Sequence, residues 1–202
     1  MREIIKCFHN QEIHTLDRTN YVVNPLLDHH PETTFSLLQD AVHELSKLIN
    51  FENTVKIVCE EDRGGFIGSI IAYEHKKSLA MVKWNPVGLN GHHKVEFRNA
   101  YTTGEMFLYG VKEDENVTLV EDLIDSGGTI IAMIELLKKA NVNIVDVVCL
   151  ADKVETNGRK KIKEKTGIEV KSLMRFTAVG VRSAVVEVLG EPFSEENLEN
   201  YE

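Results

Sequence analysis

The sequence predicts an α/β fold with a mainly parallel central sheet flanked by helices. Between residues 54 and 176, apolar segments typical of buried strands alternate with segments of helical periodicity. Glycine-bearing turns follow two of the strand-like segments, at 61–65 and 126–129, and each turn leads into a helical segment. This alternation is typical of a parallel sheet that helices cover on both faces.

The first helix is predicted between Pro31 and Asn50, after an N-terminal region that gives only a short apolar stretch at 21–23. Thr33 or Thr34 is expected to cap its start, and Asn50 is expected to end it. Its apolar face consists of side chains at helical spacing, which are Phe35, Leu38, Val42, Leu45, Leu48 and Ile49.

Strands and helices are then expected to alternate. The expected strands cover residues 54–59, 78–84, 105–109, 117–120, 144–151 and 169–176, and the expected helices cover 66–75, 129–140 and 158–166. Ligands of such sheets bind beyond the carboxyl ends of the strands, so the candidate site loops are 60–65, 84–104 and 121–129. Residues 85–104 form a long polar stretch, and such stretches tend to be active-site lids.

The composition is that of an ordinary globular protein and argues against some partners. The chain has 202 residues, 43% of them hydrophobic and 27% charged, so we expect one domain over 1–202 with 1–30 and 177–202 as a peripheral hood or tail. A net charge of −9 argues against a nucleic-acid-binding surface. No apolar run approaches the roughly 20 residues of a membrane-spanning helix, so we expect no membrane partner. Three separated cysteines without a CxxC motif predict free thiols and a cytoplasmic protein.

The most informative stretch runs from Val117 to Thr129. A β-branched strand leads into Glu121 and Asp122, and a turn then opens an apolar helix. Glycines bring backbone N–H groups close to a ligand, and a helix N-terminus attracts an anion. Adjacent acids at a strand end can accept hydrogen bonds from two sugar hydroxyls. The turn alone would favour a plain βα connection, whereas the acids favour a sugar phosphate. The turn consists of Ser126, Gly127, Gly128 and Thr129.

The run V-E-D-L-I-D-S-G-G-T, which ends at Thr129, resembles the signature of the type I phosphoribosyltransferase family. The resemblance implies that family's fold, with a small hood and a mobile loop, and binding of 5-phosphoribosyl-1-pyrophosphate (PRPP). It implies that Glu121 and Asp122 hold the ribose 2- and 3-hydroxyls and that residues 125–129 cradle the 5-phosphate. It also implies Mg²⁺, with Glu121 and Asp122 as candidate ligands, and a homodimer.

A second resemblance concerns pyrophosphate. The turn formed by Glu61, Asp62, Arg63 and Gly64 is similar to the turn that binds pyrophosphate in adenine phosphoribosyltransferases, and Arg63 suits two phosphate oxygens. Lys83 ends a strand where the family places a basic residue that contacts PRPP.

The predicted mobile loop departs from the family pattern. Leu89-Asn90-Gly91 resembles the opening of the family's loop, with Asn90 in place of proline, and Tyr101 lies in its later part. Trp84 stands where many relatives have a second cation. These departures leave open a regulator that senses PRPP without turnover.

The candidate base site pairs Asp125 with Lys153. In the 6-oxopurine enzymes of the family an acid at the position of Asp125 is thought to face the purine, so we expect Asp125 to be the general base. Lys153 matches a lysine that donates to the purine O6, which would discriminate against the amine of adenine. Phe176 and Met174 are possible walls for the base, although core packing is favoured for both. The predicted activity is therefore a purine phosphoribosyltransferase, with a 6-oxopurine favoured over adenine.

Overall fold

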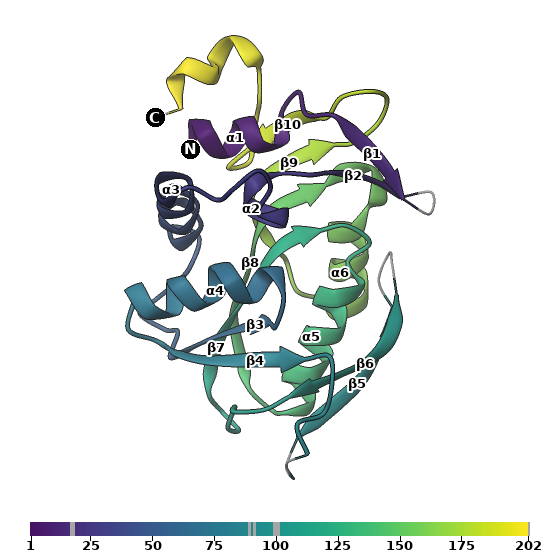
Figure 1. Ribbon diagram of the computed structural model, residues 1–202. Coiled ribbons are helices and arrows are strands. Elements are labelled where there is room, and N and C mark those ends of the chain that lie inside the picture. The colour runs from purple at the N-terminus through teal and green to yellow at the C-terminus, as the bar shows by residue number, and fades with distance from the viewer. Residues whose placement is uncertain (17–18, 89, 91, 99–101, 202) are drawn as a thin grey trace.

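The computed structural model describes residues 1–16, 19–88, 90, 92–98 and 102–201. Within them, one sheet runs through the molecule (Figure 1). The five central strands are mutually parallel, and antiparallel strands are added at both edges. The predicted α/β class is therefore confirmed. From edge to edge the strands are β11 (Glu191–Pro192), β10 (Ala184–Val188), β9 (Lys171–Thr177), β8 (Asn143–Lys153), β7 (Asn116–Ile124), β3 (Lys56–Glu60), β4 (Ser78–Lys83), β6 (Thr103–Leu108) and β5 (His93–Arg98).

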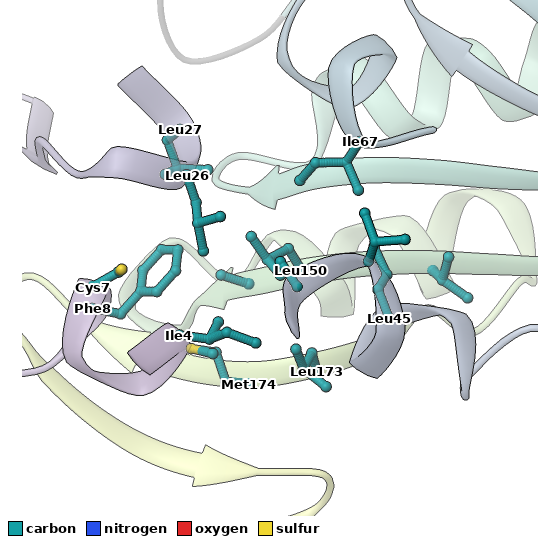
Figure 2. Close-up of a cluster of buried hydrophobic side chains, with 14 of the residues drawn as sticks. Ile4, Cys7, Phe8, Leu26, Leu27, Leu45, Ile67, Leu150, Leu173 and Met174 are labelled. Carbon is teal, nitrogen blue, oxygen red and sulfur yellow. The ribbon is translucent and has the colours of Figure 1, made fainter. Parts of the chain in front are cut away.

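Helices cover both faces of this sheet and bury their apolar side chains against it. One face is covered by α1 (Arg2–Phe8), α2 (Pro25–Asp28), α3 (Phe35–Ser46) and α4 (Arg63–Glu74), whose side chains share a core with strands β8 and β9. Figure 2 shows Phe8, Leu45 and Ile67 around Leu150 in this core. The opposite face is covered by α5 (Gly128–Lys139) and α6 (Gly158–Thr166).

The two ends of the chain form the upper part of the view in Figure 1. β1 (Ile13–Leu16) and β2 (Thr19–Val22) pair as a separate two-stranded sheet. Asn20 Nδ2 donates to the carbonyl of Ala178 at 2.9 Å, which attaches this small sheet beside the end of β9. The C-terminal 3-10 helix η2 (Glu195–Asn200) contacts α1 through an ion pair between Glu199 and Arg2, so both termini lie together.

The prediction of an irregular segment over 85–104 is wrong where β5 and β6 form an antiparallel hairpin. Val95 and Phe97 are buried against the core that contains α5, while Lys94 and Glu96 between and before them are exposed. The alternation is visible in the sequence, but the polar composition of the segment favours a loop. Leu89, Gly91 and Tyr101, expected in a mobile loop, lie outside the described residues.

Several predicted boundaries also shift. The first helix ends at Ser46 rather than near Asn50, and Phe35 is 78% exposed instead of lying on the buried face. Thr34, not Thr33, caps this helix by accepting a hydrogen bond from the N–H of Leu37 at 3.3 Å. The helix expected from residue 66 begins at Arg63. No described helix has the length and apolar character needed to cross a membrane.

Two strands extend further than expected, and the extensions position the site. β7 continues through the acid pair to Ile124, so both acids lie within the strand rather than after it. β8 continues to Lys153, which becomes its last residue. The parallel register that pairs Ile124 with Asp152 brings the carboxyl ends of the two strands to the same edge of the sheet.

Candidate active site

A cavity of about 480 Å³ opens at the carboxyl ends of β3, β7 and β8. It brings together the acid pair of β7, the whole glycine turn and the end of β8, as expected for a parallel sheet. Of the residues predicted for the site, those that line it are Asp62, Arg63, Glu121, Asp122, Asp125, Ser126, Gly127, Gly128, Thr129 and Lys153. Glu61, Gly64 and Lys83 are not part of its lining.

The glycine turn rests on the start of α6. Gly127 has φ +82, a left-handed conformation that favours glycine, and a Cβ there would lie 2.8 Å from the carbonyl oxygen of Gly158. A Cβ on Gly158 would lie 2.1 Å from the carbonyl oxygen of Asp125. Thr156 Oγ1 donates to that same oxygen at 2.6 Å. A side chain at Gly127 or at Gly158 would therefore clash, and α5 begins within the turn, at Gly128. The first N–H groups of an α-helix have no acceptor within the helix, so they point toward the turn.

The acid pair is almost completely buried. Glu121 is 3% exposed and Asp122 is 6% exposed. Glu121 Oε1 accepts a hydrogen bond from the N–H of Asp122 at 3.2 Å, whereas Glu121 Oε2 has no hydrogen-bond partner among the residues that the structure describes. Burial, and then the charge of Asp122, raises the pKa of Glu121 well above its usual value. Such an orphaned carboxylate oxygen is costly in a buried site unless a ligand hydroxyl or a cation meets it.

Glu60 is a third buried acid that the sequence reasoning missed. It is the last residue of β3 and 3% exposed. Its carboxylate accepts hydrogen bonds from the N–H groups of Asp62 at 2.7 Å and Gly64 at 2.8 Å, and from Trp84 Nε1 at 3.2 Å. Burial is the main cause that raises the pKa of Glu60 to about 7. Its place at the end of a central strand, next to the predicted turn, was the signal that could have found it.

The predicted pyrophosphate residues divide into two groups. Arg63 lines the cavity at the first turn of α4, where its Nη2 lies 2.8 Å from Asp28 Oδ1. Lys83 Nζ instead forms an ion pair with Glu61 Oε2 at 2.7 Å. A Cβ on Gly64 would lie 2.7 Å from Glu121 Oε1, so this position lies against the acid pair. Pyrophosphate binding by these residues stays a prediction.

The predicted base-binding residues meet in the same cavity. Lys153 is 3% exposed, and its ammonium donates to the backbone carbonyl of Asn20 at 2.6 Å and to Asp125 Oδ2 at 3.2 Å. Phe176 both lines the cavity and packs on Phe8, so it belongs to the hydrophobic core and also forms part of the cavity wall. Lining residues that sequence reasoning missed include Asn20, Tyr21 and Val22 of β2, together with Trp84.

Comparison with known proteins gives one family. Residues 35–184 match the family model described as phosphoribosyl transferase domain. A hypoxanthine/guanine phosphoribosyltransferase of Aciduliprofundum boonei is 30% identical over 167 residues, which are 83% of this chain and 89% of the relative. The enzyme of the same name from Methanococcus voltae is 34% identical over 157 residues, which are 78% and 82% of the two chains.

Solved structures give the same fold. The crystal structure of adenine phosphoribosyltransferase from Thermoanaerobacter pseudethanolicus superposes with a TM-score of 0.72 and 23% identity, covering 87% of this chain and 100% of that one. The adenine phosphoribosyltransferase from Rhodothermus marinus gives 0.71 at 19% identity, covering 86% and 97%. At such identities the likeness concerns the fold alone.

Proposed function

We propose that this chain, which belongs to the type I phosphoribosyltransferase family and is a phosphoribosyltransferase, transfers the 5-phosphoribosyl group of PRPP to a 6-oxopurine. The products are a nucleoside 5-monophosphate and pyrophosphate. The observation that carries this choice of base is the buried pair of Lys153 and Asp125, 3.2 Å apart in the cavity.

The glycine turn and the acid pair hold the phosphoribosyl group. Backbone N–H groups of residues 126–129 donate to the 5-phosphate, aided by the N-terminus of α5. Glu121 and Asp122 accept hydrogen bonds from the ribose diol, which would give the orphaned Glu121 Oε2 a partner. Transfer breaks the anomeric C–O bond through an oxocarbenium-like state, so the residues contribute by aligning sugar, leaving group and base.

Lys153 and Asp125 select and activate the base. The ammonium of Lys153 donates to the purine O6, and Asp125 accepts the proton that the ring nitrogen loses. Adenine has an amino group at this position, which is itself a donor, so its binding would leave two donors facing each other in a buried site. Arg63 turns from Asp28 to the pyrophosphate, where its guanidinium can contact two oxygens.

Mg²⁺ would neutralise charge on the pyrophosphate as it leaves. Glu121 and Asp122 suit this ion because carboxylate oxygens are its preferred protein ligands, and one buried oxygen of Glu121 has no hydrogen-bond partner in the described ranges. We also propose one domain over 1–202, because α1 and β10 from opposite ends of the chain share a buried core. A homodimer is proposed on the family resemblance, and a cytoplasmic location on three free, buried cysteines.

Two alternatives have specific support. Adenine as the base is favoured by the turn from Glu61 to Gly64, which is similar to that of adenine phosphoribosyltransferases. A PRPP sensor without turnover rests on Trp84 alone, which stands at the place of a second cation and lines the cavity, and the similarity to named phosphoribosyltransferases counts against it.

The release of pyrophosphate distinguishes the proposed activity from both alternatives. The protein is incubated with PRPP and Mg²⁺ together with hypoxanthine, guanine or adenine, each in a separate reaction. Release with hypoxanthine or guanine but not adenine is the expected result. Release with adenine alone would replace the proposal by the first alternative, and PRPP binding without release by the second.

A further inference from the structure

The cavity holds more acidic than basic groups. Among the described residues that line it, six are acidic and two are basic. The basic groups in and beside the cavity already have carboxylate partners: Lys153 pairs with Asp125, Arg63 with Asp28, and Lys83 with Glu61. Within the described chain, no lysine, arginine or histidine forms an ion pair with Glu60, Glu121 or Asp122. PRPP is itself a polyanion, so its entry would add negative charge beside three buried carboxyl groups.

The three unpaired acids are arranged as ligands. One carboxylate oxygen from each of Glu60, Glu121 and Asp122 lies within 4.8 Å of the others. They come from two adjacent parallel strands, β3 and β7, and all three are buried, so their positions are set by the sheet. Within the described part of the chain Oε2 of Glu121 has no hydrogen-bond partner, which is a separate sign that a ligand or an ion belongs here.

We propose that Glu60 completes a three-carboxylate site with Glu121 and Asp122 that binds a divalent cation before PRPP arrives. Glu60 accepts three hydrogen bonds, and a carboxylate offers about four lone-pair positions, so it retains one for a cation. Mg²⁺ keeps several waters when carboxylates bind it, and phosphate oxygens can later replace those waters. The inference rests on the proposed function for its purpose, but the binding itself needs no substrate.

Glu60 connects this site to two other parts of the cavity. Its carboxylate accepts hydrogen bonds from the N–H groups of Asp62 and Gly64, which flank Arg63 in the predicted pyrophosphate turn. It also accepts a hydrogen bond from Nε1 of Trp84, which is the single tryptophan of the chain. A cation on Glu60 therefore changes the charge next to the indole, and tryptophan emission reports its arrival.

Manganese provides the test because Mn²⁺ accepts the same carboxylate and water ligands as Mg²⁺. The full chain, without PRPP, is titrated with Mn²⁺ while electron paramagnetic resonance measures the free ion and fluorescence follows Trp84. We expect saturable binding of one ion with a matching change of emission, reversed by excess Mg²⁺. Glu60→Gln should weaken the affinity for Mn²⁺ roughly tenfold or more. Loss of a residue that only supports a metal ligand already weakens binding by about this factor, and loss of the ligand itself should weaken it at least as much.

A matched control is Glu135→Gln, which removes the same charge from an exposed position of α5 and should leave Mn²⁺ affinity unchanged. Absence of binding without PRPP, or equal affinity in Glu60→Gln and the unmodified chain, overturns the proposal. If circular dichroism shows Glu60→Gln to be unfolded, Asp122→Asn decides in the same way. Pyrophosphate release by the same preparation keeps the questions apart, because an active enzyme without Mn²⁺ binding refutes only the cation site.

Discussion

The ammonium nitrogen of Lys153 lies 3.2 Å from Oδ2 of Asp125, although the two residues come from the ends of different strands. The pair forms because β7 and β8 are parallel neighbours that end at the same edge of the sheet. Both side chains are buried, so the ammonium and the carboxylate depend on each other for charge compensation. A base in this cavity would meet a donor and an acceptor whose positions are fixed relative to each other.

Replacing Lys153 with alanine tests the donor. We expect affinity for hypoxanthine or guanine to fall by roughly 1–3 kcal/mol, because a charged hydrogen bond to the purine O6 is lost. PRPP affinity should change much less. Isothermal titration with base and pyrophosphate, or KM values for each substrate, would measure this. Lys160→Ala on the exposed face of α6 is the control, and equal base affinity in both variants would exclude the contact between Lys153 and the purine O6.

The same pair predicts a stability effect. Lys153→Ala should lower the free energy of unfolding by about 3–5 kcal/mol, because it leaves Asp125 buried without its cation. The double variant that also carries Asp125→Ala should recover part of this loss. Urea unfolding of both variants would measure the difference, and a double variant less stable than the single one would contradict the compensation.

Asp122→Asn tests the contact with the ribose. We expect PRPP affinity to fall by roughly 1.5–3 kcal/mol, since the carboxylate that accepts a sugar hydroxyl becomes a neutral amide. Glu52→Gln, at an exposed position, should leave PRPP affinity unchanged. Titration of PRPP in the presence of Mg²⁺ provides the measurement, and an unaltered dissociation constant in Asp122→Asn would exclude the ribose contact.

Gly158→Ala tests how the phosphate turn is supported. A Cβ at this position would lie 2.1 Å from the carbonyl oxygen of Asp125 and 2.7 Å from Cγ2 of Ile124, so the turn or α6 must shift. Overpacking of this kind costs about 1–3 kcal/mol, and PRPP affinity should fall with it. Gly167→Ala at the other end of α6 meets no atom within 4 Å but has φ +77. It should cost stability without reducing PRPP affinity, and equal PRPP binding in both variants would contradict the proposed support.

The three cysteine thiols should react slowly with alkylating reagents in the folded protein. Burial raises the pKa of Cys59 to about 12 and that of Cys7 to about 11, and it raises the pKa of Cys149 as well. A raised thiol pKa means less of the reactive thiolate at a given pH. At pH 8 the folded chain should therefore resist iodoacetamide, whereas all three thiols should react in urea. Fast alkylation of the folded chain, located by mass spectrometry, would contradict this.

Sequence reasoning reached the parts of the site that local pattern determines. The acid pair and the glycine turn are contiguous along the chain, and the helix predicted over 158–166 is α6 itself. The pairing of Lys153 with Asp125 is what the family resemblance implies, and the parallel strands β7 and β8, which end at one edge of the sheet, bring the two residues together. The roles assigned to these residues remain predictions.

The missed parts depend on contacts between distant segments or on the direction of a single side chain. Glu60 and Glu61 are adjacent, and only the folded strand shows that the first joins the buried acids while the second pairs with Lys83. Asn20 contacts Lys153 through its backbone carbonyl, and because every residue has one, the residue type does not indicate this contact. β5 lies in a polar stretch with glycines, whose composition favours a loop, although Val95 and Phe97 alternate with charged residues at the period of two that is typical of a strand.

A crystal of the protein soaked in ribose 5-phosphate would show whether the glycine turn and the acid pair bind the phosphoribosyl group. We expect the phosphate within hydrogen-bond distance of the backbone N–H groups of residues 126–129, with the sugar diol on Glu121 and Asp122. Density for the ligand at another place, or none in this cavity at saturating concentration, would contradict it.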